Sequence, residues 1–357
     1  MNATTSKTPA AMGFRMPAEW EPHEATWIGW PYNKSDWPGK FAPIPWVYGE
    51  IVRILAQGER VRIISNSSTR KQAQRILKRI GVDATRIEYF SFPFNRGWTR
   101  DSGPIFVKRY DEPKEVAVAR FRFNAWAQYP DWKKDVLIPD RAAKSFRLRS
   151  FPAYIGTTEF VLEGGSIDVN GKGTLLTTEE CLLDPKVQVR NPGFGKQEVE
   201  QALRENLGVS TVLWLGRGIA GDDTHGHVDD LCRFVNARTV VLCQETNSSD
   251  DNYRPLQENR ERLKGMRLED GSRIEVVDLP MPAPLIFDGQ RLPASYANFY
   301  FANAAVLVPT FNDPNDRVAL GLLSELIRDR PVVGIHAVDL AWGLGTLHCL
   351  TQQQPAL

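Results

Sequence analysis

Four polar segments of this chain contain residue types that can act as nucleophiles, general acids and general bases. Each combines a carboxylate, an imidazole or a thiol with small or polar neighbours. They lie at residues 98–104 (WTRDSGP), 163–168 (EGGSID), 221–230 (GDDTHGHVDD) and 348–355 (HCLTQQQP). Such residues are the material of acid–base and nucleophilic catalysis, so this chemistry is the first to test against the sequence.

Cys349 is the candidate nucleophile among the four cysteines. It lies among polar residues and follows the glycine-containing stretch 343–345, which suits a reachable thiolate. Cys181, Cys232 and Cys243 lie in apolar runs, so we expect them to be buried as small hydrophobic residues. No CxxC pair is present, which argues against a zinc knuckle or a thioredoxin-like motif.

The segment 221–230 allows three interpretations. If the chain is extended after Thr224, the two-residue period of a strand places His225, His227 and Asp229 on one face. Those three side chains form a plausible metal ligand set. The second interpretation is acid–base chemistry, in which a carboxylate works beside an imidazole. The third is a solvated polar turn, and the segment alone does not decide between them.

The spacing of the candidate residues is nearly regular. Asp101 and Glu163 are 62 residues apart, Glu163 and His227 are 64 apart, and His227 and Cys349 are 122 apart, or twice 61. Equal spacing favours a repeat architecture in which successive units each donate one residue to a central site. No clear sequence repeat accompanies this period.

Strand and helix patterns alternate along the chain. We expect strands at residues 60–66, 87–92, 104–108, 115–123 and 332–335, and helices at residues 71–80, 196–206 and 316–328. The last helix should bury Val318, Leu320, Leu322, Leu323, Leu326 and Ile327. Residues 166–178 read as a hairpin that turns at Asn170-Gly171. This mixture predicts an α/β protein, while the pattern alone does not choose its architecture.

Composition argues against several classes of partner. The 44 Lys and Arg residues balance 43 Asp and Glu, so nucleic acid and acidic membrane surfaces are poor partners. No apolar run reaches about 18 residues, and neither GxGxxG nor GxxxxGK[ST] occurs, so we expect no membrane span and no dinucleotide or phosphate-cradling site. The scattered cysteines and the lack of a signal-peptide core favour a cytoplasmic protein with reduced thiols.

Six segments in a fixed order resemble the motif series of the agmatine deiminase family of guanidine-modifying enzymes. They are PAEWEPHEATWIGWP, WTRDSGPIFV, EGGSIDVNGKGTLLTTEECLL, GDDTHGHVDDLCRF, ASYANFYFAN and LHCLTQQQPA, and they cover roughly residues 14–356. The resemblance implies an α/β pentein fold, a five-bladed propeller of ββαβ-type units with pseudo-fivefold symmetry around a central site. It also implies one catalytic domain, residues 13–357, after a flexible leader at residues 1–12.

The resemblance assigns roles to individual residues. It implies that Cys349 is the nucleophile, His227 the general acid and base, and Glu163 the residue that orients the histidine. Asp101 and Asp229 would bind the guanidinium. Further substrate-binding positions would be Asp223, Trp98 and Gly345. No metal and no other cofactor is expected.

The implied reaction is hydrolysis of agmatine to N-carbamoylputrescine and ammonia, a step of polyamine biosynthesis towards putrescine. The intermediate would be a covalent thiouronium on Cys349. A thiolate attacks well at neutral pH when its pKa is lowered locally, and the bound cationic substrate can supply that stabilisation. The expected partner is therefore a small cationic guanidine, and a homodimer is possible.

Two alternatives stay open. The first is a peptidylarginine or another arginine-type deiminase; the second is a metal-dependent hydrolase that uses the histidine-rich segment. The acidic motifs favour agmatine over arginine, because a negative field attracts a dication and repels an α-carboxylate. Arg100 and Arg217 lie close to these motifs and would reverse this argument if they pointed inward.

Overall fold

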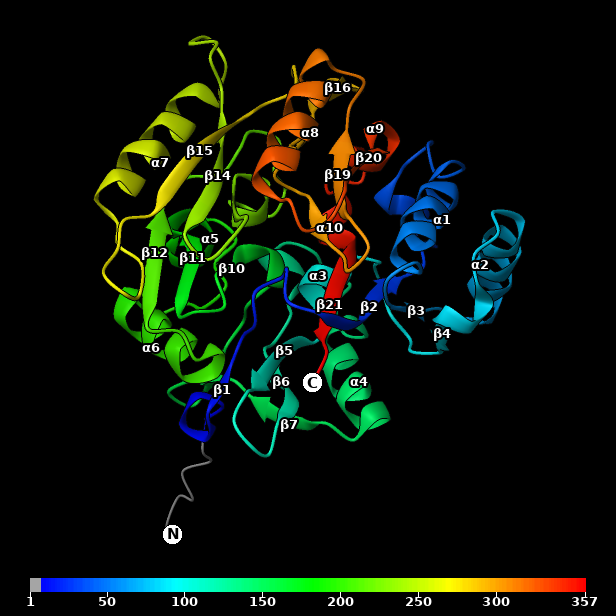
Figure 1. The fold of residues 1–357 in the computed structure, drawn as a ribbon, viewed down its shortest axis with the longest axis horizontal. Coiled ribbons are helices and arrows are strands. Elements are labelled where there is room, and N and C mark those ends of the chain that lie inside the picture. The colour runs from blue at the N-terminus through cyan, green and yellow to red at the C-terminus, as the bar shows by residue number, and fades with distance from the viewer. Residues whose placement is uncertain (1–7) are drawn as a thin grey trace.

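The computed structural model describes residues 8–357, so most of the predicted leader, residues 1–7, lies outside the described residues. The remaining leader residues include a short helix, η1 (Ala10–Met12). Five sheets of three or four strands form the body of the described chain, beside two small hairpins. Figure 1 shows these sheets arranged around the middle of the molecule with the longer helices outside them.

Each of the five sheets contains the same local unit: an antiparallel strand pair, then a helix and a third strand that pairs in parallel. The first unit is β5 (Ile105–Arg109), β6 (Glu115–Arg120), α4 (Ile138–Phe146) and β7 (Arg149–Pro152), with β1 (Phe14–Arg15) at its edge. The second is β10 (Asp168–Val169), β11 (Thr174–Thr178), α5 (Glu179–Leu183), α6 (Lys196–Leu207) and β12 (Thr211–Leu215).

The third unit is β13 (Cys232–Phe234), β14 (Thr239–Gln244), α7 (Tyr253–Gly265) and β15 (Glu275–Pro280). The fourth is β18 (Tyr300–Phe301), β19 (Val306–Thr310), α8 (Pro314–Leu326) and β20 (Val332–His336). The fifth joins distant parts of the chain: β21 (Thr351–Pro355), β2 (His23–Gly29), α1 (Ile44–Leu55), β3 (Arg60–Ile64), α2 (Ser67–Arg79) and β4 (Ile87–Phe90). This repeated ββαβ arrangement agrees with the expected pentein fold.

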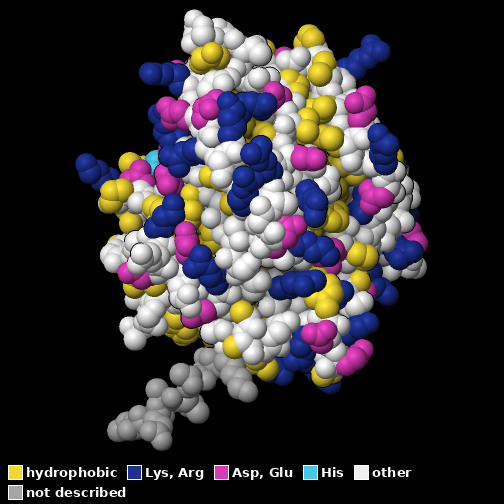
Figure 2. Space-filling model, turned by 60° about the vertical axis from the view of Figure 1, so that its left-hand side comes forward, with side chains coloured by type: hydrophobic (Ala, Val, Ile, Leu, Met, Phe, Trp, Pro, Cys, Tyr) yellow, Lys and Arg dark blue, Asp and Glu magenta, His cyan; other side chains and the backbone are white. Residues whose placement is uncertain are grey.

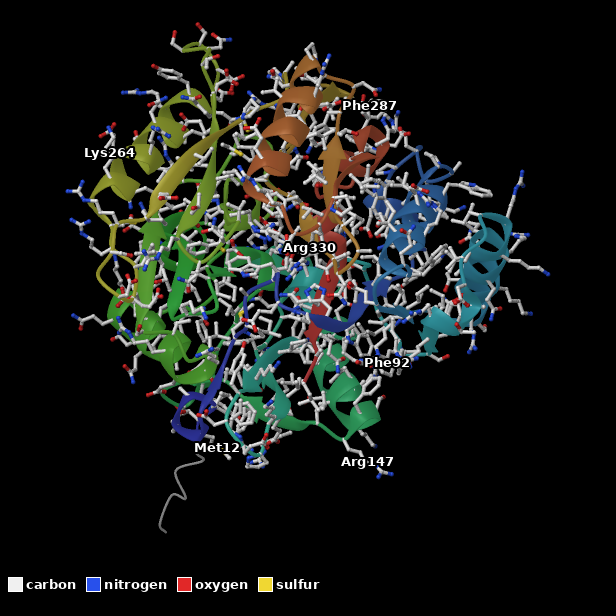
Figure 3. All side chains as sticks on the ribbon, in the orientation of Figure 1. Met12, Phe92, Arg147, Lys264, Phe287 and Arg330 are labelled. Carbon is white, nitrogen blue, oxygen red and sulfur yellow. The ribbon has the colours of Figure 1, made fainter. Side chains whose placement is uncertain are left out.

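Short elements connect these units. The helices are η2 (Lys34–Asp36), η3 (Ala84–Arg86), α3 (Thr99–Ser102), η4 (Ala125–Ala127), η5 (Asp135–Leu137), η6 (Gly164–Ser166), η7 (Val228–Asp230), α9 (Val338–Ala341) and α10 (Leu347–Leu350). The hairpins are β8 (Tyr154–Ile155) with β9 (Thr158–Glu159) and β16 (Ile286–Phe287) with β17 (Gln290–Arg291). In Figure 1, α3 and α10 lie near the centre, where side chains from several units crowd together in Figure 3.

Local chemistry explains where the predicted helices begin. The side chain of Asn66 accepts hydrogen bonds from two backbone amides of the first turn, so α2 begins at Ser67 rather than at residue 71. Asp313 caps α8 in the same way, ahead of Pro314 at the first helical position. The expectation that Val318 is buried is wrong: it is 55% exposed, because α8 directs mainly Ala319 and Leu323 inward.

The mixed charges on the surface and the buried cysteines in the core agree with the expectations from the sequence. Lys and Arg side chains alternate with Asp and Glu over the face shown in Figure 2. Cys181, Cys232 and Cys243 are buried, as predicted. Over residues 8–357, no helix combines the length and the apolar character needed to cross a membrane.

Candidate active site

Four of the candidate residues lie at equivalent places in four of the five units, in the segment just before the first strand of each. Asp101 is on α3 before β5, Glu163 precedes η6 and β10, and His227 precedes η7 and β13. Cys349 is on α10, directly before β21. The near-equal spacing therefore has a structural cause, because successive units repeat the same position.

Asn298 occupies the equivalent position in the fourth unit, before β18, and sequence reasoning missed it. Its amide nitrogen donates to Cys349 Sγ at 3.1 Å and to Asp230 Oδ1 at 2.9 Å. Its amide oxygen accepts from Thr346 Oγ1 at 2.7 Å. The available signal was the double interval between His227 and Cys349, which Asn298 divides into 71 and 51 residues.

Cys349 is almost fully buried and lines a narrow pocket together with Asp101 and Trp98. Its sulfur lies 3.9 Å from Asp229 Oδ2. Burial raises the pKa of the Cys349 thiol well above its usual value, and the charges of Asp229, Asp230 and Asp101 raise it further. The surrounding protein therefore favours the neutral thiol, and a cation bound beside it would favour the thiolate.

His227 lies between three carboxylates without forming a hydrogen bond to any of them. Its Nδ1 is 3.9 Å from Asp101 Oδ1 and 4.0 Å from Asp229 Oδ1, and its Nε2 is 3.8 Å from Glu163 Oε2. Both ring nitrogens are buried and lack a hydrogen-bond partner within residues 8–357. Burial opposes the charged form, yet Asp101, Cys181 and Glu163 outweigh it and raise the pKa of His227 well above its usual value.

Arg190 fixes Glu163 in place, and this residue was also missed from the sequence. Its Nε donates to Glu163 Oε1 at 3.2 Å, and both side chains are fully buried. The same guanidinium donates to the backbone carbonyls of Gln188 and Thr224, the latter in the loop that leads to His227. Burial would raise the pKa of Glu163, but Arg190 and His227 lower it to about 2, so Glu163 remains a carboxylate.

Asp101 is held in place by two hydrogen bonds. Asp101 accepts from the backbone amide of Gly165 at 3.0 Å and from the indole of Trp126 at 2.9 Å. Burial raises the pKa of Asp101 to about 6, with Asp229 and Glu163 adding to the shift and His227 opposing it. Gly165 is required here: a Cβ would lie 2.5 Å from His227 Nδ1 and 2.9 Å from Asp101 Oδ1.

Beside these residues, a group of paired charges is centred on Glu19. His348 donates through Nε2 to Glu19 at 2.7 Å and contacts Asp229 Oδ2 through Nδ1 at 2.6 Å. Arg100 and Arg233 each donate to Glu19 at 3.1 Å. Burial opposes the ionised form of Asp229, but the hydrogen bond with His348 lowers its pKa below the usual value.

The remaining predicted substrate positions lie around the pocket. Trp98 and Asp223 line it, and Asp223 accepts from Tyr129 Oη at 2.6 Å and Gln128 Nε2 at 2.8 Å. Gly345 lies beside Cys349, where a Cβ would be 2.8 Å from Trp98 and 3.2 Å from Cys349 Sγ. The pocket wall also contains residues that sequence reasoning had not selected: Asp36, Arg96, Trp126 and Tyr129.

The proposed extended metal-binding face of segment 221–230 is wrong. His225 has a left-handed φ of 64°, and its Nε2 contacts Asp184 at 2.9 Å. It does not join His227 and Asp229 in any cluster of metal-ligating atoms within residues 8–357. Arg100 and Arg217, which would have reversed the charge argument if they pointed inward, do not line the pocket. Arg100 pairs with Glu19, and Arg217 lies at the surface near Glu258.

Comparison with known proteins gives consistent results. The model of the Porphyromonas-type peptidyl-arginine deiminase family matches residues 15–355. The agmatine deiminase of Pseudomonas aeruginosa (strain LESB58) is 35% identical over 374 residues, covering 98% of each chain. Among solved structures, the agmatine deiminase of Enterococcus faecalis has a TM-score of 0.90 at 31% identity and covers 99% of each chain.

A cysteine-to-serine variant of the C. jejuni agmatine deiminase, solved with substrate bound, is also similar. Its TM-score is 0.83 at 30% identity, and the match covers 96% of each chain. Near-complete coverage of all three relatives means that the similarity extends over all five units described above.

Proposed function

The chain belongs to the Porphyromonas-type peptidyl-arginine deiminase family, and on that premise we propose that it hydrolyses agmatine to N-carbamoylputrescine and ammonia. One observation carries the proposal. A buried thiol, an imidazole and several carboxylates come from separate units of the fold and meet beside one narrow pocket. This arrangement suits a substrate that is cationic at its reacting carbon.

The first proposed role is binding of the guanidinium by Asp101 and Asp229. Two carboxylates can hold the planar fork of a guanidinium and keep it cationic, which makes its central carbon a better electrophile. The positive charge beside Cys349 would offset the carboxylates that raise the pKa of the thiol. Substrate binding would in this way favour the nucleophilic thiolate.

The chemical steps then follow. The Cys349 thiolate forms a bond to the guanidinium carbon, and His227 donates a proton to the departing nitrogen. Ammonia then leaves, and a thiouronium remains attached to the sulfur. His227 next removes a proton from water, which attacks the same carbon, and collapse of this adduct releases the thiolate, a neutral ureido product and one proton, which the departed ammonia takes up. Glu163, held by Arg190, would keep His227 protonated and correctly oriented for the first of these steps.

Agmatine is favoured over arginine by the charges around the pocket. Asp36, Asp101 and Asp223 all line it. Arg96 is the one cationic side chain among the described lining residues, and it is held by Asp36 and Asp131. An α-carboxylate would enter this acidic field at a cost, whereas a terminal amine would be attracted.

A substrate panel tests the proposal. Ammonia and ureido-product release should be measured for agmatine, arginine and an arginine-containing peptide. We expect agmatine to give the highest kcat/KM and the rate to withstand prolonged treatment with EDTA or phenanthroline. A preference for the peptide would assign the chain to peptidylarginine instead. Loss of activity that zinc or manganese specifically restores would favour a metal-dependent hydrolase.

A further inference from the structure

Asp36 ends η2 and lies in the same pocket as the proposed nucleophile, although no sequence motif drew attention to it. Its side chain is only 1% exposed. It belongs to a continuous group on the pocket wall: Asp36 pairs with Arg96, Arg96 lies over the ring of Tyr129, and Tyr129 donates to Asp223. None of these residues forms a hydrogen bond with Cys349, so the group is separate from the reacting end.

The two oxygens of Asp36 differ in their contacts. Oδ1 accepts from Arg96 Nη1 at 2.6 Å, whereas Oδ2 is buried and finds no hydrogen-bond partner anywhere in the described range 8–357. Asp223 is different, because each of its oxygens accepts from a neutral donor, Gln128 or Tyr129. An unpaired carboxylate oxygen in a buried site is costly, and a cationic donor is the partner that would relieve this cost best.

Charge also favours a cation here. Arg96 is shared between Asp36 and Asp131, with 3.2 Å between its Nε and the Asp131 carboxylate. Asp223 adds a third acid to the group. Burial, reinforced by Asp131 and opposed by Arg96, raises the pKa of Asp36 to about 7. Tyr32 and Tyr48 also face it, and the charge of Asp36 contributes to the raised pKa of each.

We infer that Asp36 binds the terminal amine of the substrate and makes the enzyme selective for guanidines that carry a second cation. This inference rests on the proposed function, because it requires a guanidinium at the Cys349 end of the pocket. A four-carbon diamine-type chain would then be recognised at both ends, by Asp101 and Asp229 at the guanidinium and by Asp36 at the amine.

Substrate truncation tests the inference. Butylguanidine has the carbon chain and guanidinium of agmatine but no amine. We expect Asp36→Asn to lower kcat/KM for agmatine by about 30-fold or more, the loss typical of removing one partner from a buried charge pair, and to change kcat/KM for butylguanidine by less than about threefold. Retained butylguanidine turnover also shows that the variant is folded.

The matched control is Asp131→Asn, which removes the other carboxylate on Arg96 but does not line the pocket. We expect it to leave the agmatine-to-butylguanidine ratio within about threefold of the wild-type value. An Asp36→Asn variant that loses both substrates equally, or neither, would overturn the inference. A wild-type enzyme that releases no ammonia from either guanidine would instead overturn the proposed function.

A pH series gives a second readout. The amine of agmatine is protonated throughout the neutral range, while Asp36 gains its charge as pH rises through about 7. The wild-type ratio of kcat/KM for agmatine to that for butylguanidine should therefore rise between about pH 5.5 and 8.5. The Asp36→Asn ratio should be flat. A flat wild-type ratio would contradict the assignment.

Discussion

Glu19 and His227 are both buried ionisable groups at the centre of the molecule, and their surroundings differ in one respect. Glu19 accepts hydrogen bonds from Arg100, Arg233, His348 and the backbone amide of Phe301. His227 has carboxylates within about 4 Å and no hydrogen bond from either ring nitrogen to any part of residues 8–357.

The difference separates a group with a structural role from one with a proposed catalytic role. Burial alone would raise the pKa of Glu19, but His348, Arg233 and Arg100 lower it well below the usual value, so its charge is fully compensated. Around His227, by contrast, buried polar atoms lack hydrogen-bond partners. This arrangement costs stability but leaves those atoms able to form new hydrogen bonds. Such capacity is useful where a substrate and a proton must be exchanged.

The largest expected effect lies on the reactive side. Cys349→Ser should abolish turnover, because a serine hydroxyl is a far weaker nucleophile than a thiolate at neutral pH. The circular dichroism spectrum and the Tm should remain close to wild type. As a control, Cys243→Ala removes a thiol that lies in the core and should retain activity. Retention of more than a few per cent of activity by Cys349→Ser would exclude it as the nucleophile.

Replacing each of the two residues by the neutral side chain of glutamine tests the comparison directly. Glu19→Gln should reduce the free energy of unfolding by about 3–5 kcal/mol, because Arg100 and Arg233 lose their common counter-charge. His227→Gln should abolish activity and reduce the free energy of unfolding by less than Glu19→Gln does, because it breaks no hydrogen bond and loses only charge contacts of 3.8–4.0 Å. Urea unfolding curves measure both. Equal destabilisation by the two substitutions would remove the distinction.

Substitution of the two carboxylates proposed to bind the guanidinium should have an intermediate effect. Asp101→Asn and Asp229→Asn should each lower kcat/KM by roughly 30-fold to several thousandfold. This corresponds to a loss of about 2–5 kcal/mol, the range for breaking a buried charge pair. Steady-state kinetics with agmatine and butylguanidine should show the loss for both substrates. A variant that loses less than about tenfold would show that its carboxylate does not contact the guanidinium.

The smallest effect concerns pH. The pKa of Asp101 is raised to about 6 by burial, and a guanidinium binds its ionised form. The kcat/KM for butylguanidine should therefore fall as pH decreases through about 6, by at most tenfold per pH unit. Butylguanidine is used because it lacks the amine that Asp36 would bind. Asp101→Asn should lose this acidic limb, and an unchanged limb in that variant would assign the titration to another group.

The sequence predicted those parts of the molecule that depend on local pattern. The Asn170-Gly171 hairpin, the helix from Lys196 and the strand from Val332 all form as expected. The motifs contain Asp101, Glu163 and Cys349, and the structure brings these residues together because each lies just before the first strand of its unit.

Residues whose importance comes from distant contacts were not predictable. Asn298, Arg190 and Asp36 lie in unremarkable sequence surroundings, and their importance is visible only once the chain brings their partners beside them. The prediction for His225 was wrong for a different reason. Its left-handed backbone breaks the two-residue period on which the predicted common face with His227 depended.

The pairing of β2 with β21 has a consequence for how the protein folds. These strands come from opposite ends of the described chain, and Ile28 pairs with Thr351 just two residues after Cys349. Contacts between such remote segments carry a large loop-closure entropy and slow the approach to the native state. A refolding chain can therefore form most of its local ββαβ units before the sulfur of Cys349 reaches its position.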